Sequence, residues 1–173
     1  MLKVPFVKQI NKNSCGAAAL EMVYKYYGLK KIDQKEIFDR LKTQDLEDPN
    51  IFNIATEDLV KDAKEKGFEA FWKRVDYHNI KKSIQLLKQF IDKNIPIIVC
   101  QQYTKDEPLM GHFRVVFRVD DKSVYFHDSH PKTGGSSIKW THKKFIDFWQ
   151  PTGNNVTGGV YIIIKKYVKT QTL

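Results

Sequence analysis

One of the two cysteines in the chain, Cys15, stands where a loop-like run of residues gives way to a run of helix formers. The first N–H groups of a helix have no partner within the helix, and the helix dipole is positive at that end. Both effects stabilise a thiolate, which is the nucleophilic form of cysteine, and lower the pKa of the thiol. Cys15 could also be a packing residue, half of a disulfide or a metal ligand, so other residues must decide between these roles.

A histidine and an aspartate later in the chain supply a candidate base and its partner. His112 begins the alternating run "GHFRVVFRV" and Asp128 lies in "VYFHDSH", which predicts two strands joined by a turn. A three-residue turn at 120–122 would pair Arg114 with Asp128 and bring Asp128 diagonally within reach of the His112 ring. A two- or four-residue turn would put His112 and Asp128 on opposite faces unless a bulge intervened. A His–Asp pair therefore predicts an odd-numbered turn.

Cysteine, histidine and aspartate together can act as nucleophile, base and orienter of the base. Gln9 lies six residues before Cys15, on the chain that enters the predicted helix. A loop can bring its side-chain amide beside the backbone N–H of Cys15, and two such donors can hold the oxyanion of a tetrahedral intermediate. The candidate catalytic residues are Cys15, His112, Asp128 and Gln9.

The other reactive side chains have simpler interpretations. Cys100 lies in the apolar run "PIIVCQQ", which predicts a buried and inert thiol. His127 and His130 flank Asp128 and could contribute to a metal site. Strand alternation directs His127 away from Asp128, however, and the sequence shows no clear set of further ligands. The aspartates at 120–121 are typical of a turn. We therefore predict no metal site, and the proposed chemistry needs no cofactor.

The composition is that of a globular chain. Its 173 residues suffice for one domain with a core, and we expect a single domain over residues 1–173. The net charge is +9, but basic residues are scattered in pairs and only four are arginine, the preferred reader of bases and phosphates. We therefore expect no nucleic-acid partner. No apolar run approaches the roughly 20 residues of a membrane helix, the N-terminus lacks a signal-peptide core, and two cysteines make no disulfide framework. A cytoplasmic protein without a membrane span is expected.

Hydrophobic periodicity predicts helices in the first half of the chain and strands in the second, which indicates an α+β fold. Capping residues support the helix starts, with Ser14 or Asn13 before the first helix and Asp33 before the second. The predicted helices cover 14–28, 33–42, 56–67, 77–94 and 141–149. The predicted strands cover 95–103, 111–119, 124–130 and 158–168.

Several blocks of the sequence together resemble a known family. They are Gln9 with its five-residue spacer before "CGAAALEMVYKYYG", then "GHFRVV", "VYFHD" and "KWTHKKFIDFW". The chain resembles, over nearly its whole length, the papain-like cysteine peptidases that process bacteriocins with double-glycine leaders, cysteine peptidase family 39 and its relatives. The resemblance implies that Cys15 attacks, that His112 is the base, that Asp128 orients it and that Gln9 forms the oxyanion hole.

The chain departs from the family pattern at two points. Ser14 stands where the family often has aspartate before the nucleophile, and "DSHP" delays to Pro131 the proline that often follows the family's aspartate. Many members are N-terminal domains of peptide-exporting, ATP-driven transporters, which implies a peptide or protein substrate and a transporter as partner. This sequence has no membrane-spanning segment and no phosphate-binding loop of the transporter type. It is expected to be a standalone relative or an excised domain.

The resemblance implies a papain-like α+β fold, with a helical N-terminal part that carries Cys15 packed on a C-terminal antiparallel sheet that carries His112 and Asp128. The leading hypothesis is a cysteine peptidase that hydrolyses a peptide bond, with a Gly-Gly-type leader as the implied substrate. One alternative is an acyl transferase or amidase that uses the same triad. Another is a leader-peptide-binding domain with little activity, against which the intact Cys15 argues.

Overall fold

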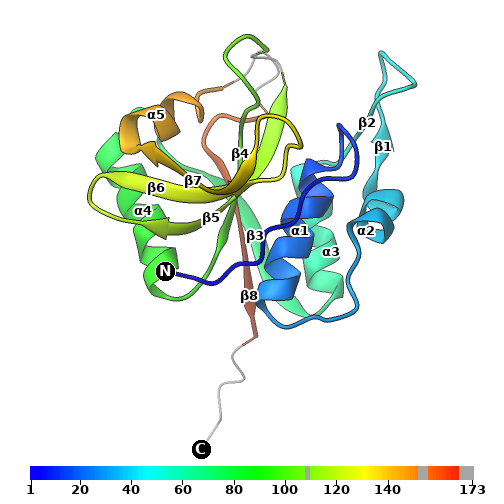
Figure 1. The fold of residues 1–173 in the computed structure, drawn as a ribbon, viewed down its shortest axis with the longest axis horizontal. Helices are drawn as coiled ribbons and strands as arrows, with labels where there is room; N and C mark the ends of the chain where they lie inside the picture. Colours follow the sequence, from blue (N-terminus) through cyan, green and yellow to red (C-terminus); the bar gives the residue numbers. More distant parts are fainter. Residues whose placement is uncertain (108–109, 152–155, 168–173) are drawn as a thin grey trace, which may run out of the picture.

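The computed structural model describes residues 1–107, 110–151 and 156–167. Within them the chain alternates helices and short strands before it enters a run of longer strands (Figure 1). The helices are α1 (Cys15–Tyr26), α2 (Gln34–Leu41), α3 (Thr56–Glu65), α4 (Ile80–Asp92) and α5 (His142–Asp147). The strands are β1 (Thr43–Gln44), β2 (Phe52–Asn53), β3 (Phe68–Arg74), β4 (Ile97–Gln102), β5 (Gly111–Val119), β6 (Ser123–Asp128), β7 (Gly135–Thr141) and β8 (Val160–Lys166).

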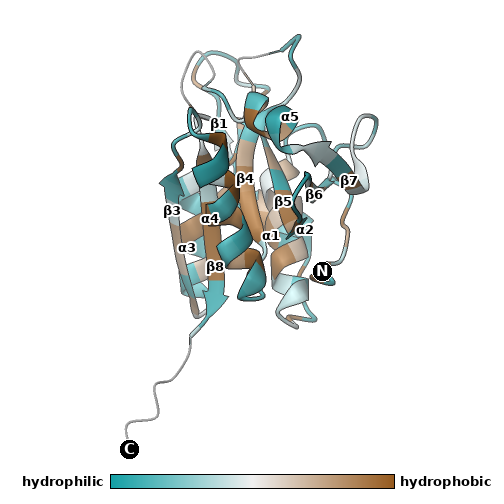
Figure 2. Cartoon of the chain, turned by 90° about the vertical axis from the view of Figure 1, so that its left-hand side faces the viewer, coloured by the Kyte–Doolittle hydropathy of each residue, from teal (hydrophilic) through white to brown (hydrophobic). Residues whose placement is uncertain are grey.

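The core of the molecule is a six-stranded antiparallel sheet in the order β3-β8-β4-β5-β6-β7. In Figure 1 the helices α1, α2 and α3 lie on one side of this sheet, and α4 and α5 lie on the other. Every residue of β4 is buried, and Figure 2 shows β4 and β8 largely in the brown of hydrophobic residues. Because helices pack on both faces of the sheet, side chains on both faces of β4 and β8 are buried, and the sequences of these two strands are therefore continuous apolar runs. The predicted α+β fold is confirmed.

Helix α1 is the element that carries the candidate nucleophile, and it packs against β5. Its residues 16–24 are all buried, because the run of small and apolar side chains suits a helix in the middle of the molecule. The absence of a side chain at Gly16 lets α1 pack closely against its neighbours, since a Cβ atom there would lie 3.2 Å from the Phe113 ring and 3.5 Å from Ile54. The helix ends at Tyr26, and Gly28, two residues later, has a φ of +91°, a conformation that favours glycine.

The expected helices agree with the structure in type and approximate position. Asp33 caps α2 as predicted, and its carboxylate accepts a hydrogen bond from the backbone N–H of Lys35 at 2.7 Å. Ser14 occupies the N-cap position of α1. The expected closing strand at 158–168 is found as β8, and its last predicted residue lies outside the described part of the chain.

Four strands were not expected from the sequence. Strand β3 adds a segment of the helical half to the edge of the sheet, where it pairs with β8. Strand β7 extends the opposite edge by pairing with β6, and β1 and β2 form a separate two-stranded hairpin. The burial of β3 and β7 is mixed rather than alternating, so the period-two signal of a half-buried strand is weak in both.

The turn between β5 and β6 differs from the prediction. Val119 pairs with Val124, which leaves four residues between them, and the odd-numbered turn expected from the sequence is therefore wrong. A shift in pairing between Val116 and Arg118 compensates for the extra residue, so that Arg114 still pairs with Asp128, the register that a three-residue turn would have given. A β-bulge adds one residue to one strand and thereby returns the following side chains to the required face.

Candidate active site

Cys15 is the first residue of α1 and is partly exposed, in a cleft of about 400 Å³. The helix has no side-chain cap, because the hydroxyl of Ser14 bonds with the backbone of Asn11 instead, donating to its oxygen and accepting from its N–H, each at 3.1 Å. The first turn also carries no acidic residue. No side-chain cap therefore competes for the N–H groups at the start of α1, and these can serve a bound anion.

His112 and Asp128 form a short, buried hydrogen bond. The His112 Nε2 atom lies 2.6 Å from Asp128 Oδ1, and both residues are less than 5% exposed. A carboxylate only accepts, so the proton of this bond belongs to Nε2. The other ring nitrogen, Nδ1, is then left for the Cys15 thiol, which lines the same cleft as His112 and whose interaction with the ring shifts the pKa of both groups. The imidazole thus lies between the sulfur and the carboxylate. His112 is on β5, Asp128 is on the adjacent strand β6, and Cys15 is at the start of α1.

The pKa values of the pair are displaced toward each other. Burial raises the pKa of the Cys15 thiol, but the hydrogen bond from His112, its charge and the backbone N–H of Phe113 outweigh burial, and the net shift is downward. Burial lowers the pKa of His112, yet the bonds to Asp128 and Cys15 give a net upward shift. A lowered thiol pKa and a raised imidazole pKa together favour a thiolate–imidazolium pair.

Arg114 holds the second oxygen of the Asp128 carboxylate. Its Nε donates to Oδ2 at 2.8 Å, and the arginine is only 3% exposed. Its other nitrogens donate to the backbone oxygens of Gln102 and Tyr103 at 3.0 and 3.1 Å. Against the effect of burial, which raises it, the pKa of Asp128 is held well below its ordinary value by His112, Arg114 and the backbone N–H of His130. The carboxylate is therefore ionised and fixed in orientation.

Gln9 is buried beside the same strand end. Its backbone N–H donates to the oxygen of Ser129 at 2.9 Å, and its side-chain oxygen accepts from the Ser129 hydroxyl at 3.0 Å. One hydrogen of its Nε2 is used by the backbone oxygen of Asn11 at 2.8 Å. An amide NH₂ has two hydrogens, so one remains for a ligand. No hydrogen bond between the Gln9 amide and Cys15 is seen among the described residues.

Gln34 fixes the segment that leads to the nucleophile. Its side-chain NH₂ donates to the backbone oxygen of Lys8 at 2.6 Å, and its side-chain oxygen accepts from the N–H of Ile10 at 3.0 Å. The backbone N–H of Gln34 in turn donates to the Glu21 carboxylate of α1 at 3.0 Å. Residues 8–10, which include Gln9, are thereby tied to both α1 and α2.

Two of the remaining reactive residues are structural, as interpreted from the sequence. Cys100 is buried, and burial raises the pKa of its thiol to about 12. His127 donates from Nε2 to the backbone oxygen of Val4 at 2.9 Å and accepts at Nδ1 from Ser137, so it turns away from Asp128. In the described part of the chain, no three His, Cys, Asp or Glu side chains are grouped so as to hold a metal ion.

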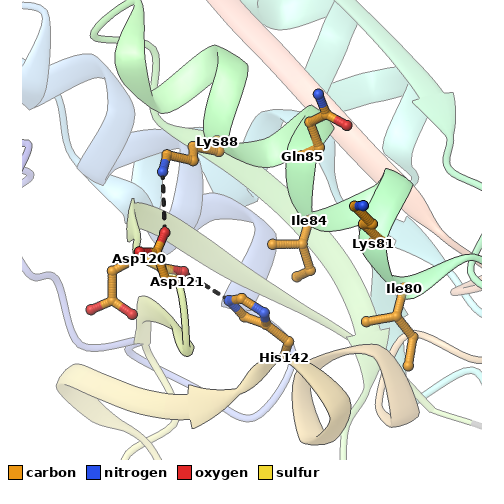
Figure 3. A pocket seen from close by; sticks show the side chains of 8 residues that line it. All are labelled: Ile80, Lys81, Ile84, Gln85, Lys88, Asp120, Asp121 and His142. Atoms are coloured by element: carbon orange, nitrogen blue, oxygen red, sulfur yellow. Dashed lines mark hydrogen bonds and ion pairs between the residues drawn. The ribbon is translucent and has the colours of Figure 1, made fainter.

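A larger hollow of about 590 Å³ lies away from Cys15, between α4, the turn at 120–121 and the start of α5 (Figure 3). Its polar contacts join its own walls, with Lys88 3.5 Å from Asp121 and the His142 ring 2.9 Å from the backbone oxygen of Asp120. The eight residues that line it include no cysteine, serine or threonine. The lining of this hollow therefore offers no thiol or hydroxyl nucleophile, whereas Cys15 lines the smaller cleft.

The structure adds residues to the site that the sequence did not reveal. Tyr103 and His130 line the cleft with Cys15 and His112, and Arg114 completes the contacts of Asp128. The predicted pairing of Arg114 with Asp128 was a signal for the last of these, since side chains paired across two strands are close enough for an ion pair. Tyr103 follows β4 in a loop, where no sequence pattern fixes its direction.

A helical part that carries Cys15, packed on an antiparallel sheet that carries His112 and Asp128, is a papain-like fold. The model of the Peptidase_C39 like family matches residues 1–157, and the chain belongs to this family. A search of curated proteins found no match. None of the helices in residues 1–107, 110–151 and 156–167 is long and apolar enough to cross a membrane.

Solved structures similar to this chain support the same fold. The peptidase domain of Streptococcus ComA, a bifunctional ABC transporter of a quorum-sensing pathway, is 21% identical with a TM-score of 0.69, covering 95% of this chain and 99% of that one. A double-glycine-motif protease from an AMS/PCAT transporter, solved with its leader peptide, is 21% identical with a TM-score of 0.66, covering 96% and 94%. A Bacillus anthracis protein classed as C39-like is 18% identical with a TM-score of 0.71, covering 98% of each chain.

Proposed function

We propose that this protein is a cysteine peptidase that cleaves a peptide bond after a double-glycine leader. The observation that carries the proposal is the imidazole of His112 between the Cys15 thiol and the Asp128 carboxylate, with the pKa of the thiol lowered and that of the imidazole raised. The substrate class rests on the relatives, one of which is a double-glycine-motif protease in complex with its leader peptide. A peptide-exporting transporter is the proposed partner, and the cytoplasm is the proposed location.

The proposed reaction uses Cys15 as nucleophile, His112 as acid and base, and Asp128 to orient the imidazole. The Cys15 thiolate attacks the carbonyl carbon of the scissile bond, and the negative charge moves to the carbonyl oxygen. The backbone N–H of Cys15 and the spare N–H of Gln9 are the proposed donors to this oxyanion. The His112 imidazolium gives its proton to the leaving amine, which departs and leaves a thioester on Cys15. Neutral His112 then takes a proton from water, which attacks the thioester and releases the acid and the thiol.

The proposal can be tested with a synthetic peptide that contains a Gly-Gly pair before a polar segment, with the products identified by mass spectrometry. Cleavage after the second glycine is expected for the wild type and for Cys100→Ala, and none for Cys15→Ala. Cys100→Ala is a matched control because it removes the chain's other thiol from a buried position. Cleavage that persists in Cys15→Ala would refute the assignment of the nucleophile, and transfer of the peptide to an added amine in place of water would identify an acyl transferase.

Selective alkylation reports on the thiolate without a substrate. Because the pKa of Cys15 is lowered and that of Cys100 is raised, iodoacetamide at pH 6 should label Cys15 and leave Cys100 unmodified. His112→Ala removes the hydrogen bond and the positive charge that stabilise the thiolate, so labelling of Cys15 at this pH should fall by about tenfold or more. Equal and slow labelling of both cysteines would contradict the thiolate–imidazolium pair.

A further inference from the structure

Two aromatic residues form a wall of the cleft beside the imidazole of His112. The Tyr103 ring meets the His112 ring edge-on, with 5.4 Å between centroids and 65° between planes. The His130 ring lies 5.0 Å from Tyr103 and 6.2 Å from His112. Tyr103 follows β4, His130 follows β6, and both line the cleft that contains Cys15. The catalytic mechanism proposed above uses neither side chain.

The hydrogen bonds of His130 fix which of its nitrogens carries the proton. The backbone N–H groups of Thr133 and Lys132 point at Nδ1 from 3.1 and 3.3 Å, and the Thr133 hydroxyl lies 2.8 Å from the same atom. A backbone N–H can only donate, so Nδ1 is the acceptor and the neutral ring carries its proton on Nε2. Nε2 is 2.8 Å from the Tyr103 hydroxyl. His130 is therefore the donor of this bond, and the tyrosine oxygen is the acceptor.

A donor of known position follows from this assignment. The Tyr103 oxygen accepts from His130, so its own hydrogen is available for another acceptor, and among residues 1–107, 110–151 and 156–167 no hydrogen bond from this hydroxyl to a partner other than His130 is seen. The backbone of Tyr103 is held at both ends, because its N–H donates to Met110 at 3.0 Å and its oxygen accepts from Arg114 at 3.1 Å. The hydroxyl is thus a preorganised donor on the wall of the cleft, beside the reacting groups.

We propose that Tyr103 binds the substrate, donating its hydroxyl hydrogen to a main-chain carbonyl oxygen of the peptide next to the scissile bond, and that His130 is the positioning residue that orients this hydroxyl. The inference rests on the proposed peptidase function, since a peptide is the ligand that supplies main-chain carbonyl oxygens as acceptors. Main-chain recognition does not require a large side chain on the substrate. It therefore suits a substrate with glycine at the residues before the cleavage site.

The test compares two probes that react with the same thiolate. A Leu-Gly-Gly chloromethyl ketone binds as a peptide before the Cys15 sulfur forms a bond to its methylene carbon and chloride leaves. Iodoacetamide alkylates the Cys15 sulfur in the same way, with loss of iodide, but makes no peptide contacts. Tyr103→Phe keeps the ring against His112 and removes only the hydroxyl. Loss of one neutral hydrogen bond should lower the second-order rate of the peptide probe by about three- to tenfold, mainly through weaker initial binding, and leave the iodoacetamide rate unchanged within about twofold.

A variant of His130 tests its positioning role. In His130→Asn the amide oxygen can take the place of Nδ1 as acceptor for the N–H of Thr133, so the local turn is kept while the donor to Tyr103 is lost. The peptide probe should again react more slowly, and the double variant with Tyr103→Phe should react no more slowly than Tyr103→Phe alone, because both changes act on one hydrogen bond. Additive effects of the two substitutions would overturn the role of His130.

Two further outcomes separate this inference from the proposed function. A Tyr103→Phe variant that reacts with the peptide probe as fast as the wild type, or that slows both probes equally, would overturn the role of Tyr103 and leave the peptidase assignment intact. A wild-type protein whose reaction with the peptide probe shows no saturation would overturn both. Cleavage of the Gly-Gly peptide by the same preparation distinguishes the first case from the second.

Discussion

Replacing Arg114 by methionine should destabilise the protein more than any comparable surface substitution. Arg114 is 3% exposed, its Nε donates to Asp128 at 2.8 Å, and two backbone oxygens accept from its terminal nitrogens at 3.0 and 3.1 Å. Methionine keeps part of the volume but removes one of the two cationic side chains that pair with the buried Asp128 carboxylate, and leaves its Oδ2 atom without the Arg114 donor. Removing one partner of a buried ion pair costs about 3–5 kcal/mol of the free energy of unfolding. For a chain of this size that corresponds to a fall in Tm of about 6–20 °C.

The chain contains a matched control on the same strand. Arg118 also pairs with an aspartate, Asp120, at 3.2 Å, but its side chain is 42% exposed and stacks over the ring of Tyr125 at 4.4 Å. An exposed ion pair and an exposed cation–π contact contribute about 1–2 kcal/mol at most. Arg118→Met should therefore lower the free energy of unfolding by no more than this amount. Urea denaturation followed by tryptophan fluorescence measures both variants under one condition.

The cost of leaving the Asp128 carboxylate without Arg114 can be isolated by a double variant. If the carboxylate is the source of the loss, Arg114→Met combined with Asp128→Asn should lose clearly less stability than the sum of the two single variants. Arg114→Lys keeps a positive charge but not the planar fork, so its stability should lie between wild type and Arg114→Met. The reasoning is refuted if Arg114→Met loses no more stability than Arg118→Met, or if the double variant is additive.

Three other predictions concern the same site. Gly16→Ala places a Cβ atom 3.2 Å from the Phe113 ring and should slow alkylation of the cysteine that precedes it by severalfold at pH 6, with circular dichroism unchanged; an unchanged rate would contradict the close-approach role. Ser129→Ala releases the Gln9 amide and should lower kcat for the Gly-Gly peptide by about three- to tenfold without changing the iodoacetamide rate, whereas loss of both would indicate general damage. The folded-state pKa of Asp128 is lowered, so its charge contributes stability above about pH 4 that is lost as the pH falls. The Tm of the wild type should therefore fall more steeply with acid than the Tm of Asp128→Asn. Parallel curves of Tm against pH would contradict this contribution of Asp128.

The sequence predicted the parts of the site that depend on local pattern. The helix that begins at Cys15 and the strands that carry His112 and Asp128 follow from hydrophobic periodicity. The pairing of Arg114 with Asp128 was expected only for a three-residue turn, and the structure reaches it through a four-residue turn and a bulge. The sequence did not predict that the turn has an even number of residues. The bulge that makes this possible depends on how two strands twist against each other, and no clear sequence pattern indicates it. The buried strand with Cys100 was likewise evident from its continuous apolar run.

The missed elements depend on contacts between distant parts of the chain. Strand β3 is an edge strand, and its partner β8 lies some ninety residues away, so neither its own residues nor its neighbours in sequence indicate the pairing. The donor role of Tyr103 depends on the tautomer of His130, which is itself set by two backbone N–H groups in the following turn. Such roles become visible only when the atoms that compete for one proton are placed in space.

The position of the bulge explains why the site forms although the turn has the unexpected length. His112 and Arg114 bind the two oxygens of one carboxylate, and they lie on β5 ahead of the register shift between Val116 and Arg118. A shift between His112 and Arg114 would turn one of the two away from Asp128, because one residue reverses the face of every side chain beyond it. A bulge located after Val116 can compensate for an even-numbered turn without changing the positions of His112 and Arg114 relative to Asp128. The constraint imposed by the chemistry therefore acts on the first residues of β5, and the turn at 120–123 can vary.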